Sequence, residues 1–239
     1  MPVNAPSGLS GFWQVVWAII RKDLAAERRT WQILSVMLVF SLTAVVVFSF
    51  GLGAAGLNPN SALARDAAPG FLWATILLAG TLGLNRSLTA EQENHSLDAL
   101  LMAPVDRSAI YLGKVGSASL FTLTMEAIVV PAFVIFYNQP FWRPQVLGII
   151  FLATIGYVAT GIMVSSMSSQ ARMREALLPV LLLPLSLPLV LSAATAVSAY
   201  LQPVPPNWAD VQFPIAVVIA FDILMLTAGF LLYHYVVEE

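Results

Sequence analysis

The sequence predicts an all-α integral membrane protein with six transmembrane helices and an additional helix at the membrane surface. Of the 239 residues, 59% are hydrophobic and only 10% are charged, whereas a soluble domain carries about 25% charged residues. Six stretches are long and apolar enough to cross about 30 Å of hydrocarbon, which takes about 20 residues of helix. None of them shows the alternating pattern of a barrel strand, so helices are the expected spanning form.

The six predicted spans all lie in one region of the chain, which follows a short N-terminal region. The spans are residues 33–52, 67–84, 110–137, 146–167, 177–200 and 213–235. Residues 1–31 form the N-terminal tail and surface helix, and residues 32–239 form the transmembrane domain. No soluble domain is expected in the chain.

The distribution of basic residues predicts the orientation in the membrane. Nine of the eleven lysines and arginines precede the first span or lie in and beside the loops after the second and fourth spans. The other two are Arg65 and Arg143. Loops rich in Lys and Arg stay in the cytoplasm, so both termini are predicted to be cytoplasmic. No cleaved signal peptide is expected, because the first eleven residues carry no basic charge.

Residues 9–31 have the periodicity of an amphipathic helix. Apolar residues recur at steps of three or four, at Leu9, Trp13, Val16, Trp17, Ile20 and Leu24. Such a helix is expected to lie in the membrane interface, with its tryptophans at headgroup depth and its basic residues toward anionic lipid. Two interpretations remain open: a simple surface anchor, or a lever at the cytoplasmic gate of a transporter.

The predicted cytoplasmic loop of residues 85–114 is the longest connection. Thr89 and Gln92 have the spacing of a capping box, and Ser96 is a second candidate cap for a short helix. Pro104 is expected to end that helix. Four of the thirteen acidic residues lie here: Glu91, Glu93, Asp98 and Asp106.

Within this loop, three leucines are predicted to share one face of the short helix: Leu97, Leu100 and Leu101. Asp106 or Ser108 is placed to cap the third span. The short helix then has two possible uses. It lies in the membrane interface, or it docks into the cleft of a partner protein and receives force from it.

Motifs for catalysis and metal binding are missing from the sequence. A P-loop needs G-x-x-x-x-G-K-[ST], but Gly113-Lys114 has no glycine five residues earlier and is followed by Val115. The chain has no cysteine, and its only histidines, His95 and His234, are far apart, so no metal-ligand spacing is present. We therefore predict no catalytic residues, no metal site and no enzyme activity of the chain itself.

Two carboxylates, Glu126 and Asp222, lie inside predicted spans. At 1.5 Å per residue they are expected at depths of about 16 and about 13 Å from the outer end, near the middle of the membrane. Charged groups at this depth usually face the bundle interior or a water-filled cavity. In a structural interpretation each is protonated and bonded to a neighbour, with Thr122 and Thr124 close to Glu126 in sequence. In a functional one they line a path or exchange a proton.

Three segments resemble the haem exporter protein B (CcmB) family. They are WQILSVMLVFSLTAVVVFSFG at residues 31–51, APGFLWATILLAGTLGLNR at residues 68–86 and LLMAPVDRSAIYLGK at residues 100–114. The resemblance runs from about Phe12 to the C-terminus. It implies an exporter-type (ABC-2-like) permease subunit of the bacterial inner membrane that acts in haem export or haem handling during cytochrome c maturation.

The same resemblance implies the partners and the coupling residues. The expected partners are a separate CcmA-type ATPase, a second copy of the chain, CcmC- and CcmD-type membrane proteins and lipid, but no nucleic acid. The ATPase contact would comprise Glu91, Glu93, Leu97, Leu100, Leu101 and Arg107. ATP would be bound by the partner and haem would be the possible substrate. No cofactor is assigned to this chain, because no histidine lies at outer depth to ligate iron.

Two other functions remain open at this point. A proton-coupled secondary transporter would use Glu126 and Asp222 and would work without an ATPase. A membrane assembly factor would support cytochrome c maturation without transporting anything itself.

Overall fold

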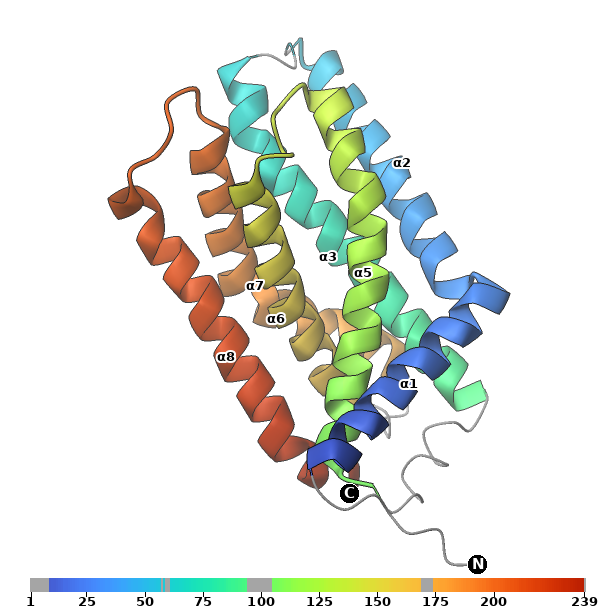
Figure 1. Ribbon diagram of the computed structural model, residues 1–239. Helices are drawn as coiled ribbons and strands as arrows, with labels where there is room; N and C mark the ends of the chain where they lie inside the picture. Colours follow the sequence, from blue (N-terminus) through green and yellow to red (C-terminus); the bar gives the residue numbers. More distant parts are fainter. Residues whose placement is uncertain (1–8, 57, 59–60, 94–104, 169–173, 239) are drawn as a thin grey trace, which may run out of the picture.

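The computed structural model describes residues 9–56, 58, 61–93, 105–168 and 174–238. Within these residues the chain forms seven helices and no strands (Figure 1). The helices are α1 (Leu9–Thr30), α2 (Gln32–Ala54), α3 (Ala62–Glu93), α5 (Arg107–Tyr137), α6 (Pro144–Ser168), α7 (Arg174–Leu201) and α8 (Trp208–Glu238). The all-α prediction is confirmed.

Six of these helices are long and apolar enough to cross a membrane, namely α2, α3, α5, α6, α7 and α8. They form one bundle, and α1 crosses one end of it beside the C-terminal end of α8 (Figure 1). We call this the basic end, because it carries Arg28, Arg29, Arg86 and Arg107. The opposite end carries Arg65 and Arg143, so the basic residues of the described chain separate as the sequence pattern predicts.

The helices extend beyond the predicted spans and shorten the predicted loop of residues 85–114. Helix α3 continues to Glu93 and α5 begins at Arg107. The Thr89 hydroxyl donates to the Asn85 carbonyl at 3.0 Å, so Thr89 lies inside a helix and its predicted capping role is wrong. Asp106 does cap α5, because its carboxylate accepts from the Ser108 amide at 3.0 Å. The short helix predicted at residues 96–103 lies outside the described residues.

The core of the bundle centres on α6, which packs against α3, α5, α7 and α8. Tyr157 of α6 is fully buried, and its ring fills the space beside Gly80 of α3, where a side chain would come within 2.6 Å of Tyr157 Cε1. The Tyr157 hydroxyl also donates to the Leu77 carbonyl at 2.9 Å and lies 2.9 Å from the Thr81 hydroxyl. These contacts hold α6 against α3.

Helix α1 packs on α5 through isoleucines and glycines. A side chain at Gly113 would come within 2.9 Å of Ile19 Cβ, and one at Gly116 within 2.7 Å of Ile20 Cδ1. The apolar stripe predicted for α1 therefore faces two different environments. One side contacts α5, whereas Trp13 and Trp17 point away from the bundle and are 61% and 60% exposed. The two glycines cause this division, because they let α1 approach α5 more closely than it would approach a lipid surface.

Candidate functional site

A buried polar network joins α1 to α5 at the basic end. Lys114 is only 4% exposed, and its ammonium lies 3.2 Å from the Asp23 carboxylate. The Ser117 hydroxyl donates to the same carboxylate at 2.9 Å, and Lys22 lies 3.3 Å from it on the exposed side. Because a buried charge is tolerated only when it is paired and hydrogen-bonded, this network determines where α1 sits on the bundle.

The turn from α1 into α2 is held by Glu27. Trp31 adopts a left-handed backbone conformation with φ 52° between the two helices, and its side chain makes no cap. The Glu27 carboxylate instead accepts from the amides of Ile33 at 3.0 Å and Leu34 at 2.8 Å, two of the amides that lack a partner at a helix start. Glu27 is 4% exposed. Helices α1, α2 and α5 thus form one connected corner.

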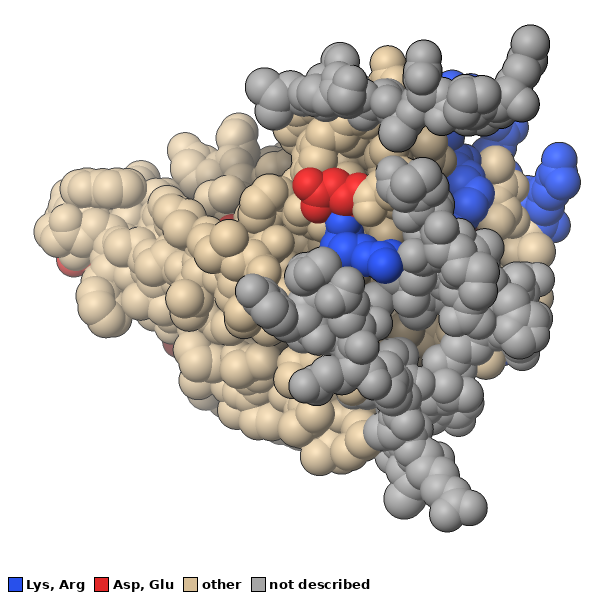
Figure 2. Space-filling model, turned by 90° about the horizontal axis from the view of Figure 1, so that it is seen from below, with Lys and Arg blue, Asp and Glu red and all other residues tan. Residues whose placement is uncertain are grey.

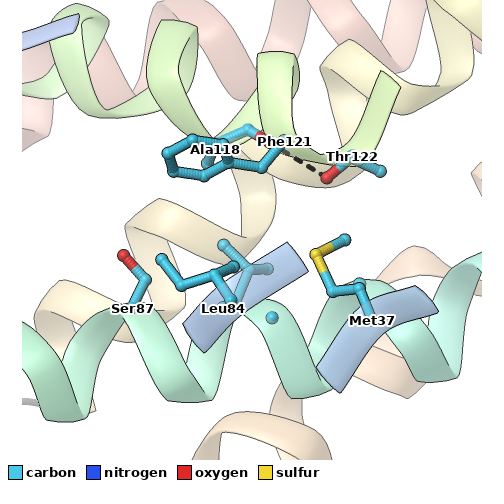
Figure 3. A pocket seen from close by; sticks show the side chains of 9 residues that line it. Met37, Leu84, Ser87, Ala118, Phe121 and Thr122 are labelled. Atoms are coloured by element: carbon cyan, nitrogen blue, oxygen red, sulfur yellow. Dashed lines mark hydrogen bonds between the residues drawn. The ribbon is translucent and has the colours of Figure 1, made fainter. Parts of the chain in front are cut away.

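A cleft of about 400 Å³ opens between this corner and α3. Its mouth is polar, with Asp23, Glu27 and Arg29 from α1 and Ser87 from α3. A second, much smaller cavity shares Ile33, Ser87 and Phe121 with it and has room for about one water molecule, with an accessible volume of about 10 Å³. There, Met37 of α2 with Leu84 and Ser87 of α3 faces Ala118, Phe121 and Thr122 of α5 (Figure 3).

The predicted coupling residues lie at the ends of α3 and α5 or outside the described residues. Glu91 and Glu93 are in the last turn of α3, one and three residues after Ala90, which lines the cleft. Arg107 is the first residue of α5. Leu97, Leu100 and Leu101 lie outside the described residues. Seen from this end, basic side chains lie at one edge of the face and also near its middle, beside acidic ones (Figure 2).

The sequence pattern assigned the basic residues of α1 to anionic lipid and gave no role to Asp23 or Glu27. Their spacing of four residues on a helix otherwise rich in Arg and Lys was the available signal, because it places both carboxylates on one face. Neither carboxylate can be assigned a partner from sequence alone.

Glu126 is buried between α5 and α6. It is 3% exposed, and the Thr154 hydroxyl of α6 donates to its Oε1 at 2.6 Å. Its Oε2 has no hydrogen-bond partner in the described part of the chain. The hydroxyls of Thr122 and Thr124, the neighbours expected from the sequence, donate instead to carbonyls of their own helix. The face of α5 that carries Glu126 meets α6 instead.

Asp222 lies on the other side of α6. It is 7% exposed and packs against Gly156, where any side chain would collide with its Oδ1. That oxygen also has no partner among the described residues. Because Thr154 and Gly156 are two residues apart on α6, they differ by about 3 Å in height and by about 200° in direction. The two carboxyl groups thus lie at similar height along α6, and α6 separates them.

Thr154→Val should destabilise the protein by about 1–2 kcal/mol. The valine has the same shape but cannot donate to Glu126, and hydrogen bonds between transmembrane helices contribute up to about 2 kcal/mol. The free energy of unfolding in mixed micelles measures the loss. Thr195→Val is the matched control, because the Thr195 hydroxyl is exposed and donates only within α7, to the Leu191 carbonyl. Equal effects of the two changes would show that the hydrogen bond from Thr154 to Glu126 contributes nothing to the free energy of unfolding.

No metal centre is found among the residues that the structure describes, since no three His, Asp or Glu side chains gather there. The helices and the buried polar contacts between them define a multi-pass, all-α membrane protein with the architecture of a permease. The chain belongs to the CcmB protein family, whose family model matches residues 14–233.

Relatives from three bacteria, each named Heme exporter protein B, are similar to this chain over most of its length. The protein from Bradyrhizobium diazoefficiens is 27% identical over 183 residues, which cover 76% of this chain and 80% of the relative. That from Pseudomonas aeruginosa is 26% identical over 71% of this chain and 74% of its own. That from Rhodobacter capsulatus is 29% identical over 75% and 81%. The family resemblance seen in the sequence is thereby confirmed.

Proposed function

We propose that this chain is the membrane permease subunit of an ABC transporter for haem export or haem handling in cytochrome c maturation. The observation that carries the proposal is the family match over residues 14–233, together with relatives named Heme exporter protein B. Six helices able to span a membrane agree with this role. The chain supplies no nucleotide site of its own in this scheme, so ATP is hydrolysed by a separate CcmA-type subunit.

In this proposal the basic end faces the cytoplasm of a bacterium and receives the ATPase. Its arginines and lysines support that orientation, because cytoplasmic segments of inner-membrane proteins are rich in them. The ATPase contacts the ends of α3 and α5 and the segment between them, through Glu91, Glu93, Leu97, Leu100, Leu101 and Arg107. A second copy of this chain and CcmC- and CcmD-type proteins complete the assembly.

The corner of α1, α2 and α5 gives the ATPase a way to act on the bundle. Force applied near Arg107 enters α5, which is tied to α1 by Lys114 and Asp23 at 3.2 Å. Helix α1 is tied in turn to the start of α2 by Glu27. A push at the basic end therefore moves three connected helices together instead of bending one loop. In this scheme α1 is more than a passive anchor.

The proposal is tested by co-purification and by cytochrome c maturation in a strain that lacks the native gene. The wild-type chain should co-purify with a P-loop ATPase and restore covalent haem staining of c-type cytochromes. Leu97→Glu and Leu100→Glu should lose both the ATPase and the haem stain. Val204→Glu is the control, because Val204 is 77% exposed at the opposite end of the bundle and its replacement should change neither readout.

Other outcomes of the same test would replace the proposal. Maturation that survives with a catalytically inactive ATPase would identify an assembly factor. Substrate movement by the purified chain alone, driven by a proton gradient and lost in Glu126→Gln or Asp222→Asn, would identify a secondary transporter.

A further inference from the structure

The cleft between α3 and the corner of α1, α2 and α5 is lined by three side chains that can donate hydrogen bonds to a ligand. They are Lys22 and Arg29 of α1 and Gln32 at the start of α2. All three are exposed, so a ligand in the cleft can reach them. The volume of about 400 Å³ lies within the range of about 300–1,000 Å³ that is usual for small-molecule sites.

The two carboxylates that line the same cleft, Asp23 and Glu27, already have donors of their own. Asp23 accepts from Lys114 at 3.2 Å and from Ser117 at 2.9 Å. Glu27 is buried and accepts from two backbone amides at the start of α2, at 3.0 and 2.8 Å. A cationic ligand would have to displace these bonds, whereas an anionic ligand would leave them intact.

Arg29 is the charged group of the cleft that has no counterion. Lys22 lies 3.3 Å from Asp23, whereas the Arg29 guanidinium makes no ion pair within the part of the chain that the structure describes. Together with Lys114, which contacts Asp23, the site holds three basic groups and two carboxylates and therefore has an excess of positive charge. A guanidinium presents two parallel N–H donors that match two oxygens of one phosphate. The charge and the donor geometry both favour a phosphate ligand.

Exposed tryptophans indicate the depth of the cleft in the membrane. Trp31 is 59% exposed and lies between Thr30 and Gln32, which both line the cleft. Trp13 and Trp17 of α1 are exposed as well. Because exposed tryptophans of membrane proteins concentrate at the boundary between hydrocarbon and water, we expect the cleft at the level of the lipid headgroups. The phosphates of the membrane lipids lie at the same level.

We propose that this cleft binds a phosphate group, with Arg29 as its main partner and Lys22 and Gln32 as further donors. At headgroup depth the expected source is an anionic phospholipid, and a soluble phosphate ester has the same chemistry. The site differs from the general attraction of a basic helix to anionic lipid, because only the residues that face the cleft take part. It does not depend on the proposed function, because neither haem nor the ATPase enters the argument.

The test is native mass spectrometry of the full chain in detergent, titrated with phosphatidylglycerol or with phosphatidylcholine of the same acyl chains. Saturable binding of phosphatidylglycerol is expected. Phosphatidylcholine should bind more weakly, because its cationic group would meet the bases of the cleft and find the carboxylates occupied. Arg29→Gln should weaken phosphatidylglycerol binding about tenfold, as expected for the loss of one charge-assisted hydrogen bond.

Arg28→Gln is the matched control. Arg28 is exposed beside Arg29 but does not line the cleft. The two variants lower the net charge equally, so any general attraction to anionic lipid weakens by the same amount in both. Arg28→Gln should therefore bind phosphatidylglycerol like the wild type.

A second pair of variants keeps the test decisive if Arg29→Gln does not fold. Ala26 is exposed and lines the cleft, so Ala26→Trp fills the cleft without changing a charge and should abolish saturable binding. Ala25 is also exposed but lies outside the cleft, so Ala25→Trp should bind like the wild type.

Glycerol 3-phosphate, added to the complex with phosphatidylglycerol, separates the two sources of the phosphate. Lipid that stays bound in its presence supports a headgroup site, and lipid that it displaces supports a site for a soluble phosphate ester. Equal binding of phosphatidylglycerol and phosphatidylcholine would overturn the proposal. So would an equal loss of binding in Arg29→Gln and Arg28→Gln, because the attraction would then be that of the whole basic helix.

Discussion

Asp23→Ala should lower the free energy of unfolding by about 3–5 kcal/mol, which is the usual cost of removing one partner from a buried ion pair. The reason is that Lys114, 4% exposed, would keep its charge and lose the carboxylate at 3.2 Å. The Ser117 hydroxyl would lose its acceptor as well. Denaturation in mixed micelles, followed by circular dichroism, measures the change.

Two further variants separate the buried pair from a general effect of charge. Lys22→Met removes the other basic partner of Asp23, but Lys22 is 44% exposed in its side chain, so the loss should stay below about 1 kcal/mol. The double variant Asp23→Ala with Lys114→Met should recover part of the stability, because no buried charge is left without a partner and Lys22 is exposed to solvent. If Asp23→Ala were no more harmful than Lys22→Met, the network would not hold α1 on α5.

Gly229→Leu should disrupt the contact between α5 and α8 and lower the free energy of unfolding by about 3 kcal/mol or more. Overpacking usually costs roughly 1–3 kcal/mol, and this site should lie at the upper end of that range. A side chain at Gly229 would collide with the ring of Tyr111, which is completely buried. That ring is also held by its hydroxyl, which donates to the carbonyls of Ala159 at 3.2 Å and Met225 at 3.3 Å. Neither the ring nor α8 has room to move without losing these bonds.

The matched control is Gly148→Leu in α6, where a new side chain would meet nothing within 4 Å. Leucine is the better helix former by nearly 1 kcal/mol, so this variant should be as stable as the wild type or slightly more stable. Thermal unfolding in detergent and limited proteolysis compare the two variants. Equal stability of Gly229→Leu and Gly148→Leu would show that α8 does not pack on Tyr111 as described.

The number and order of the spans were predictable because they depend on local composition. A run of about 20 apolar residues must span the hydrocarbon whatever its neighbours are, and all six predicted runs lie within helices of the structure. The helix ends were less predictable. Helix α3 continues to Glu93 through polar residues, because backbone hydrogen bonds continue beyond the hydrocarbon wherever no residue breaks them.

The polar sites were predictable only in part. Glu126 and Asp222 were found because a carboxylate inside an apolar run is rare, and their similar depth followed from residue counting. Their contacts, Thr154 and Gly156, come from a third helix, which residue counting does not place. The cap at Asp106 was found because its amide partner is two residues away.

The sequence by itself determined the all-α membrane architecture, the separation of basic residues between the two ends and the family, because each depends on local composition or local motif. Only the tertiary structure decided how α1 is used. From sequence it is an amphipathic surface helix, but Gly113 and Gly116 let it pack on α5. That contact brings Asp23 to Lys114, which is 91 residues away along the chain. Such pairing depends on which helices become neighbours, and the pattern of a single helix does not contain that information.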